Sequence, residues 1–490
     1  MNTKNHNDRT NTKLRVLLLM TAVVATLLLA AGTAGAVDNI DSCRTINASN
    51  APADGLVNVT SNISTSTNQC INVTVSDVTL DGGNNIIETT GGLSFSAIDV
   101  SNSTTDPTNV TVRNVTVTGG WTDAIDYDGA DDGLVTGVTS QQNFNSVRFI
   151  SDANNNTVRD SELSGGSGPG VRVAFVDNTT IENTTMTGNS VGVEVDESTN
   201  TTITDSDVIQ STNSGIFVTQ SDGTFVKGGT FINDSGADGV RLRNSNDALI
   251  RDVNTSTNTE SGISVESGSD GVVVEDNTVL GNNQDGNSPS SDAGIFVNDS
   301  VNVEVLGNTV RNNQEAGMSI LFGDGIEVRD NRITENCGGQ FGVRLEETSD
   351  ALFVGNNVSN NTGVGMQVFD ASPNLTVRDS KFNDNGGLGG FQDEPGATLV
   401  NVTANGNDNY GLSLSQNTTL RNGEARNNAG HGIVANDGST TLEDVIVSDN
   451  GQEEIDFDGP TPSSATNLTV GTVRYASLEA KSVQIGRAHV

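Results

Sequence analysis

The sequence predicts an all-β fold, a right-handed single-stranded parallel β-helix solenoid of roughly 15 coils of 21–25 residues each. Three observations support this prediction. A motif of glycine, apolar residue, any residue and apolar residue recurs between Gly170 and Gly432 at that interval. A second apolar marker keeps the same step from Val112 to Val328. Both markers alternate with period two, which is typical of strands, and no later segment has a competing helical period.

Short corners rich in Gly, Asn, Asp and Ser separate these strands. Parallel strands otherwise need a long, usually helical crossover, so the chain must wind as a β-helix. The twist preference of strands favours a right hand. Corner asparagines such as Asn282, Asn312, Asn331 and Asn360 are expected to form stacked side-chain ladders and to tolerate left-handed backbone.

Residues 1–36 read as a secretory signal peptide. Basic residues between Lys4 and Arg15 precede the apolar run Val16–Ala31 and a small-residue site that ends at Ala36. The alternative, a membrane anchor, would require ~20 apolar residues and would not be followed by a small-residue cleavage site. We therefore expect a secreted protein, extracellular or at the cell surface, with no transmembrane segment in the mature chain.

The mature chain divides into a cap, a solenoid and an irregular end. Residues 37–74 form the N-terminal cap, where Cys43 and Cys70 are predicted to pair as a disulfide; two free buried thiols are the alternative. Residues 75–478 form one β-helix domain, since a solenoid core grows along one axis. Residues 479–490 are irregular, and the last six, 485–490, "IGRAHV", match a sequencing adapter read in frame, which suggests a gene-model artefact.

The charge balance limits the environment and the partners. The net charge is -38, with 62 acidic against 24 basic residues. Concentrated salt screens such self-repulsion, so a halophile, specifically a haloarchaeon, is the expected source. Nucleic acid is excluded as a partner because its binding needs basic patches. The many Asn-x-Ser/Thr sequons predict N-glycosylation of an exported chain.

The stretch from 121 to 133, "WTDAIDYDGADDG", concentrates groups suited to a sugar or Ca²⁺ site. The rings of Trp121 and Tyr127 could stack on a sugar, and Asp123 and Asp126 could act as acid and base. The candidate Ca²⁺ ligands are Asp128, Asp131 and Asp132. Against these roles, acidic corners are common in halophile proteins and Asp-Gly is ordinary turn chemistry.

Alignment of the coils stacks outward residues of the glycine-led strand into one column. This outward column contains Asp126, Arg148, Arg172, Glu194, Phe217, Arg241, Ser264, Phe296, Ser319, Arg344 and Gln367. Arg148 and Arg172 join the candidate catalytic residues, while Phe217, Arg241, Phe296 and Arg344 could bind an acidic polysaccharide by guanidinium forks and ring stacking. The favoured alternative is a charge ladder such as Asp126 with Arg148 and Arg172 with Glu194.

The stacked coils, the "VTLDG" entry at Val78 and the "VRDN" repeat at Val328 resemble the NosD-like right-handed parallel β-helix proteins. That group includes carbohydrate-binding proteins and sugar hydrolases, and pectate lyases have similar outward columns of catalytic Arg and calcium-binding Asp. NosD itself is linked to copper delivery, yet soft copper sites want clustered His, Cys or Met. Here Met318 and Met366 stand at inward strand positions.

The sequence thus favours an exported, non-catalytic protein that interacts with polysaccharide or a surface glycan. One alternative is a polysaccharide lyase or glycoside hydrolase of pectate-lyase-like fold, working near Trp121 to Arg172. Another is a NosD-type copper-delivery accessory protein. Ca²⁺ is the one cofactor that the residues of the mature chain suggest. The resemblance to NosD concerns the scaffold, and function must be argued from the site.

Overall fold

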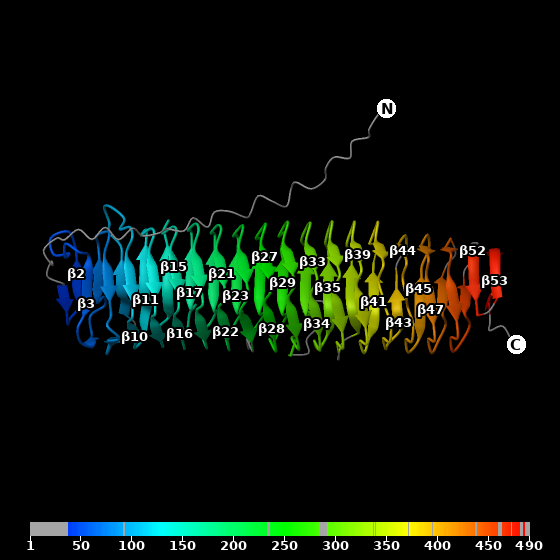
Figure 1. The fold of residues 1–490 in the computed structure, drawn as a ribbon, viewed down its shortest axis with the longest axis horizontal. Coiled ribbons are helices and arrows are strands. Elements are labelled where there is room, and N and C mark those ends of the chain that lie inside the picture. The colour runs from blue at the N-terminus through cyan, green and yellow to red at the C-terminus, as the bar shows by residue number, and fades with distance from the viewer. Residues whose placement is uncertain are drawn as a thin grey trace, which may run out of the picture. The chain divides into compact units, whose positions relative to one another are not determined.

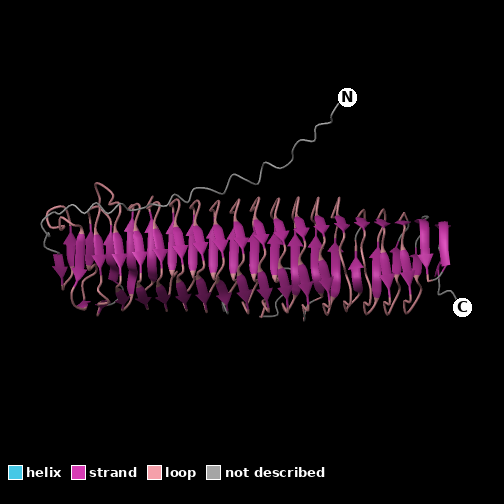
Figure 2. Cartoon of the chain, in the orientation of Figure 1, coloured by secondary structure: helices cyan, strands magenta, loops and turns pink. Residues whose placement is uncertain are grey.

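A computed structural model describes residues 38–480 and 484–485, except 92–93, 233–235, 285–291, 337, 339, 371, 394, 437–438, 459–462 and 472. The predicted leader at 1–36 lies outside these residues, as do Cys337 and all but the first residue of the adapter-like end. The described chain is a stack of three-sided coils, in which successive coils lie side by side along one axis (Figure 1). It contains strands and loops and no helix over the described ranges (Figure 2).

Face A carries the first predicted marker, with its apolar residue pointing inward at the centre of short strands. Its strands pair in parallel, coil upon coil, from β1 to β52. They are β1 (Asp38–Ile40), β3 (Leu56–Val59), β6 (Thr79–Asp81), β9 (Thr111–Arg113), β12 (Leu134–Thr136), β15 (Thr157–Arg159), β18 (Thr180–Glu182), β21 (Thr202–Thr204), β24 (Phe225–Lys227), β27 (Leu249–Arg251), β30 (Val273–Glu275), β33 (Glu304–Leu306), β36 (Glu327–Arg329), β39 (Leu352–Val354), β42 (Thr376–Arg378), β44 (Thr398–Val400), β46 (Thr419–Arg421), β49 (Thr441–Glu443) and β52 (Ser463–Val470).

Face B is a side of the coil that the sequence markers did not reveal. Most of its strands have a single inward residue, such as Met186 or Ser140, and too little alternation to be recognised. They are β4 (Ile63–Thr65), β7 (Ile86–Thr89), β10 (Thr116–Thr118), β13 (Thr139–Gln141), β16 (Glu162–Ser164), β19 (Thr185–Thr187), β22 (Asp207–Ile209), β25 (Thr230–Ile232), β28 (Asn254–Ser256), β31 (Thr278–Leu280), β34 (Thr309–Arg311), β37 (Arg332–Thr334), β40 (Asn357–Ser359), β47 (Glu424–Arg426) and β50 (Ile446–Ser448).

Face C carries the glycine-led marker and the outward column. Its strands are β2 (Arg44–Ile46), β5 (Ile71–Val73), β8 (Ser94–Val100), β11 (Trp121–Asp128), β14 (Asn145–Ile150), β17 (Val171–Ala174), β20 (Val193–Asp196), β23 (Ile216–Thr219), β26 (Val240–Arg243), β29 (Ile263–Glu266), β32 (Ile295–Asn298), β35 (Ala316–Leu321), β38 (Phe341–Glu346), β41 (Val364–Phe369), β43 (Gly389–Gln392), β45 (Tyr410–Leu414), β48 (Ile433–Asn436) and β51 (Ile455–Asp458). These 18 parallel strands mark 18 coils, somewhat more than the roughly 15 expected from the sequence repeat.

The two ends of the stack differ from its middle. Parallel pairing of β1 with β3 and of β2 with β5 begins upstream of residue 75, where the sequence placed the start of the solenoid. In the structure a disulfide joins Cys43 and Cys70 there. At the other end, β53 (Val473–Ala480) and β54 (Gln484–Ile485) pair antiparallel with β52 and β51. No helix of the described chain has the length and apolar character that a membrane crossing demands.

One continuous hydrophobic core fills the coils, and buried asparagine ladders line two corners, one between faces A and B that contains Asn331 and one between faces B and C that contains Asn282. Asn331 shows the pattern: its Nδ2 donates to the Val305 carbonyl at 2.8 Å, and its Oδ1 accepts from the Asn308 backbone N–H at 2.9 Å. The asparagines named from the sequence therefore divide into two kinds. Asn282 and Asn331 are buried ladder residues, whereas Asn312 and Asn360 adopt left-handed backbone with φ of 56° and 58°.

Candidate functional site

The outward column of face C is aligned as the sequence predicted. Each member faces the next across consecutive parallel strands, in the order Asp126, Arg148, Arg172, Glu194, Phe217, Arg241, Ser264, Phe296, Ser319, Arg344 and Gln367. The alignment follows from the near-constant repeat length, because a one-residue slip would turn the apolar residues of a strand outward.

Asp123, Asp126 and Arg148 form a connected group on this face. Arg148 donates to both carboxylate oxygens of Asp126, Nε to Oδ1 at 2.9 Å and Nη2 to Oδ2 at 2.7 Å. The same Nη2 lies 3.2 Å from Oδ2 of Asp123, whose Oδ1 accepts from Asn145 Nδ2 at 2.7 Å. Asp123 is only 2 % exposed and Asp126 only 5 %. The guanidinium therefore holds two carboxylates that water hardly reaches.

Carboxyls with raised pKa values concentrate on face C. Burial, together with the charge of Asp126, raises the pKa of Asp123 to about 6 against an ordinary 3.8. Burial also raises the pKa of Asp99, Glu194 and Asp238, the last of them well above its usual range. These four carboxyls lie on face C strands or, for Asp238, just before one.

A second charged group lies farther along the same face. Asp238 is buried just before β26, its Oδ2 lies 3.7 Å from Arg241 Nε, and its Oδ1 accepts from the Ser261 backbone N–H at 2.9 Å. Arg241 also donates to Glu266 at 3.0 Å. As at Arg148, one guanidinium contacts two carboxylates.

The arginines of the outward column are all held by carboxylates. Arg148 pairs with Asp126, Arg172 with Glu194 at 3.8 Å, Arg241 with Glu266, and Arg344 with Glu346. The predicted charge ladder is thus confirmed at both pairs named from the sequence. A polysaccharide carboxylate would have to displace a partner from each fork, so these guanidinium groups are poorly placed for an acidic ligand.

Three of the four aromatic side chains predicted to bind sugar are buried. Trp121 and Tyr127 are fully enclosed in the core, where Tyr127 donates its hydroxyl to the Val110 carbonyl at 3.0 Å and packs edge-on against Phe149. A ring inside the solenoid cannot stack on a sugar, so this prediction was wrong for both. Phe296 is buried in a small outer cluster, whereas Phe217 is half-buried on face C.

The predicted Ca²⁺ ligands do not come together. Asp131 and Asp132 lie in the corner after β11; the Asp131 carboxylate accepts the Asn154 backbone N–H at 2.7 Å, and Asp132 adopts left-handed backbone. Among the described residues, only Glu346, Glu347 and Asp370 bring three such ligand atoms within 4.8 Å of one another. The strand and corner geometry therefore separates Asp128, Asp131 and Asp132 and gives no support to the site proposed from their spacing.

Two exposed phenylalanines beside Asp123 were missed. Phe95 is 68 % exposed on β8, and Phe144 is 39 % exposed just before β14, the two strands on either side of β11. Each precedes a residue that contacts the acidic pair: Ser96 donates to Asp126 at 3.5 Å, and Asn145 donates to Asp123. Phe95 and Phe144 each lie three residues before an inward apolar residue, Ile98 and Val147 respectively. Alignment of the coils could therefore have shown that the two rings occupy equivalent positions.

An outer hydrophobic cluster covers face C farther along, over β32 to β41. It consists of Ala293, Phe296, Ala316, Leu321, Phe341 and Val364, with Phe369 packed against it. The guanidinium of Arg344 lies 5.1 Å from the centre of the Phe369 ring, within cation–π range. These contacts engage Phe296 and Arg344 with protein neighbours instead of leaving them open to a ligand.

Comparison with protein families identifies the fold. The family described as "Right handed beta helix region" matches residues 191–341, 287–392 and 338–470, together more than half of the 490 residues. The chain belongs to this right-handed β-helix family. The family "Periplasmic copper-binding protein (NosD)" matches residues 60–236 of the same β-helix protein, which confirms the NosD-like resemblance. No curated protein sequence matches the chain.

Several solved structures are similar to this chain at low sequence identity. The Azotobacter vinelandii mannuronan C-5 epimerase AlgE4 A-module is 14 % identical, with a TM-score of 0.43, over 64 % of this chain and 88 % of that one. The periplasmic alginate epimerase AlgG is 12 % identical, with a TM-score of 0.42, over 63 % of this chain and 78 % of that one. The pre-mature bacteriophage phi29 gene product 12 is 11 % identical, with a TM-score of 0.47, over 92 % of this chain and 72 % of that one. Likeness at this level carries no argument about chemistry.

The residues described here do not fit a copper site of the kind that the NosD name implies. Met318 and Met366 are buried in the core on coils two steps apart, and Cys43 and Cys70 are consumed by their disulfide. His431, the one histidine in the described chain, pairs with Glu453 at 3.1 Å. A soft metal would want several such ligands converging on one point.

Proposed function

We propose that this β-helix protein is exported and binds a neutral polysaccharide, without cleaving it, on the part of face C that contains Asp123. The observation that carries the proposal is the exposure of Phe95 and Phe144 on either side of this buried polar group. Exposed rings beside polar groups suit the apolar faces and hydroxyls of sugars. Export agrees with the Cys43–Cys70 disulfide, a bond typical of oxidising compartments.

Two features support binding over catalysis. Asp123 and Asp126 are almost fully buried, and Arg148 occupies both oxygens of Asp126, so neither carboxylate is free to approach a glycosidic bond. One feature also favours a neutral ligand. The column arginines are already paired with carboxylates, so a uronic acid would have to displace a partner from each guanidinium.

The test is affinity electrophoresis of the mature chain in molar KCl against dextran, laminarin, mannan and a polyuronate. We expect a neutral polymer to retard the wild type and the Phe95→Ala, Phe144→Ala double variant to lose at least tenfold in affinity. Leu388→Ala, which removes an exposed apolar side chain from a distant coil, is the matched control. Equal retardation of wild type and double variant, or retardation by the polyuronate alone, would contradict the proposal.

One observation favours a second candidate, a polysaccharide lyase or glycoside hydrolase. The pKa of Asp123 is raised to about 6, which suits a group that exchanges protons near neutral pH. The same polymers are therefore assayed for new chain ends. New ends that vanish in the Asp123→Asn variant would establish the enzyme, while retardation without new ends supports the binding protein.

A further inference from the structure

A column of left-handed residues follows the face C strands, at the corner that leads to face A. We name it the corner column; its members, aligned by the strand register, are Ser151, Phe175, Glu197, Gln220, Asn244, Ser267, Asp299, Phe322, Glu347 and Asp370, all with positive φ. Most are polar, and the smaller ones among them tolerate this backbone best. Phe175 and Phe322, with φ of 60° and 53°, are exceptions, because a bulky side chain is disfavoured there.

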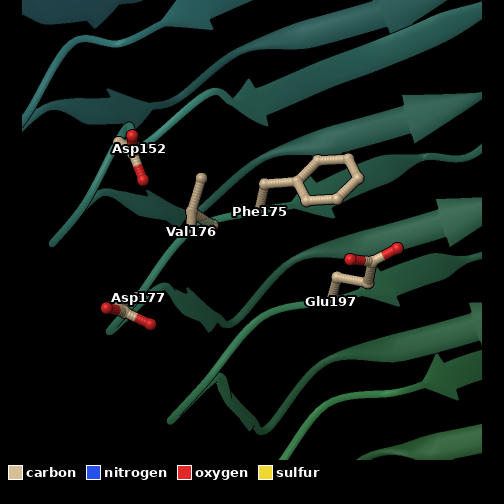
Figure 3. Close-up of a pocket in the computed structure, with 5 residues that line it drawn as sticks. All are labelled: Asp152, Phe175, Val176, Asp177 and Glu197. Carbon is tan, nitrogen blue, oxygen red and sulfur yellow. The ribbon is translucent and has the colours of Figure 1, made fainter.

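Phe175 is 52 % exposed, and its neighbours in the corner column are Ser151 on the preceding coil and Glu197 on the following one. Asp152 follows Ser151 on the preceding coil, and neither its carboxylate nor that of Glu197 has a side-chain partner within the described chain. Together with Val176 and Asp177 they line a hollow of about 270 Å³, in which the phenyl ring lies between the coils of Asp152 and Glu197 (Figure 3). The Asp177 carboxylate is engaged by the Thr199 hydroxyl, so the free acceptors are those of Asp152 and Glu197.

A related arrangement is found at Phe322, where both aligned neighbours are acidic. This ring is 48 % exposed, with Asp299 on the coil before it and Glu347 on the coil after it. Neither flanking carboxylate forms a side-chain hydrogen bond or ion pair with the residues described. Twice, then, a strained and exposed phenyl ring has an unengaged acid on the coil before it and another on the coil after it, while Gln220, Asn244 and Ser267 occupy intervening corners.

We propose that each of these two triads is a subsite for one pyranose of a neutral polysaccharide. The apolar face of the sugar would lie on the phenyl ring, and its hydroxyls would donate to the carboxylates in the adjacent coils. A uronic acid would be repelled by the same carboxylates. The ligand class rests on the proposed function, but the surface is a different one, with no residue in common with the Asp123 group.

The spacing of the two subsites predicts bivalent binding. Phe175 follows β17 and Phe322 follows β35, six coils apart, and coils stack at ~4.8 Å, so the rings are separated by ~29 Å. A polymer can span this distance and a trisaccharide cannot. Engagement of one subsite raises the effective concentration of the same polymer at the other, so long chains gain affinity that short ones lack.

The experiment replaces Phe175 and Phe322 by Asn, singly and together, because Asn suits left-handed backbone and protects folding. Gln220→Ala in the same column is the matched control. With dextran, laminarin and mannan, we expect each single substitution to weaken polymer binding at least tenfold. With the matching trisaccharide, calorimetry should show one site fewer per substitution and unchanged affinity at the remaining ones.

Unchanged polymer affinity in Phe175→Asn and Phe322→Asn would overturn the corner subsites. Binding of chitosan without binding of any neutral glucan would also overturn them, because it would indicate a site for a cation. The two proposals fail separately. If only the Phe95, Phe144 variant loses binding, the corner proposal alone is wrong. If no neutral polymer binds the wild type, the proposed function is wrong as well.

Discussion

Replacing Asp123 by Asn removes the carboxyl whose pKa rises from 3.8 to about 6 in the folded chain. A carboxyl with a higher pKa in the folded state holds its proton more tightly there than in the unfolded chain. Its contribution to stability is therefore most favourable below pH 3.8, declines as pH rises to about 6, and is constant above that. A difference of about two pKa units corresponds to about 3 kcal/mol.

We therefore expect the unfolding free energy of wild type minus that of Asp123→Asn to fall by about 3 kcal/mol between pH 3.5 and pH 7. Urea titrations in molar KCl measure it, and the fluorescence of the single Trp121, buried on the same strand, reports this coil. Asp128→Asn, which removes an exposed carboxylate from β11, controls for the loss of one charge. A difference that stays constant with pH, or grows with it, refutes the account of Asp123.

Two further predictions concern what holds the coils together. Asn331→Ala should lower the unfolding free energy by roughly 4 kcal/mol, because it leaves the Val305 carbonyl and the Asn308 N–H buried without partners. Asn213→Ala, at an exposed asparagine that donates to Ser190, should cost less than about 1 kcal/mol in the same urea titration; equal losses would contradict the ladder's role. Replacing Cys43 and Cys70 by Ser should destabilise the first coils by about 3 kcal/mol, seen as faster proteolysis near the N-terminus, and an unchanged cleavage rate would contradict this.

The sequence predicted faces A and C well because their strands repeat an alternation that every coil must keep. The register from Asp126 to Gln367 could be written down from the glycine motif alone. Face B escaped because a strand such as Thr185–Thr187 buries one side chain, and a single residue has no period. The number of coils was underestimated for a related reason, since the first coils near Cys43 lack the motif.

Predicting the site was harder because composition does not tell which side of a strand a residue occupies. Asp126 was placed outward, and the same alternation puts its neighbour Tyr127 inward, but the chemistry of the ring was given more weight than its position. Phe95 and Phe144 lie outside the alternating core of their strands and so drew no attention. The pairing of Arg172 with Glu194 was foreseen because both occupy a single column.

The parallel stack has one more consequence, which concerns evolution. Because every coil advances the chain by the same ~4.8 Å step, any two features on one face are separated by a whole number of steps. Duplicating or deleting one repeat between Phe175 and Phe322 would change their separation by one step and leave both corners intact. The number of coils thus sets the distance between two such features, and gain or loss of repeats can match the length of the binding surface to the length of a ligand.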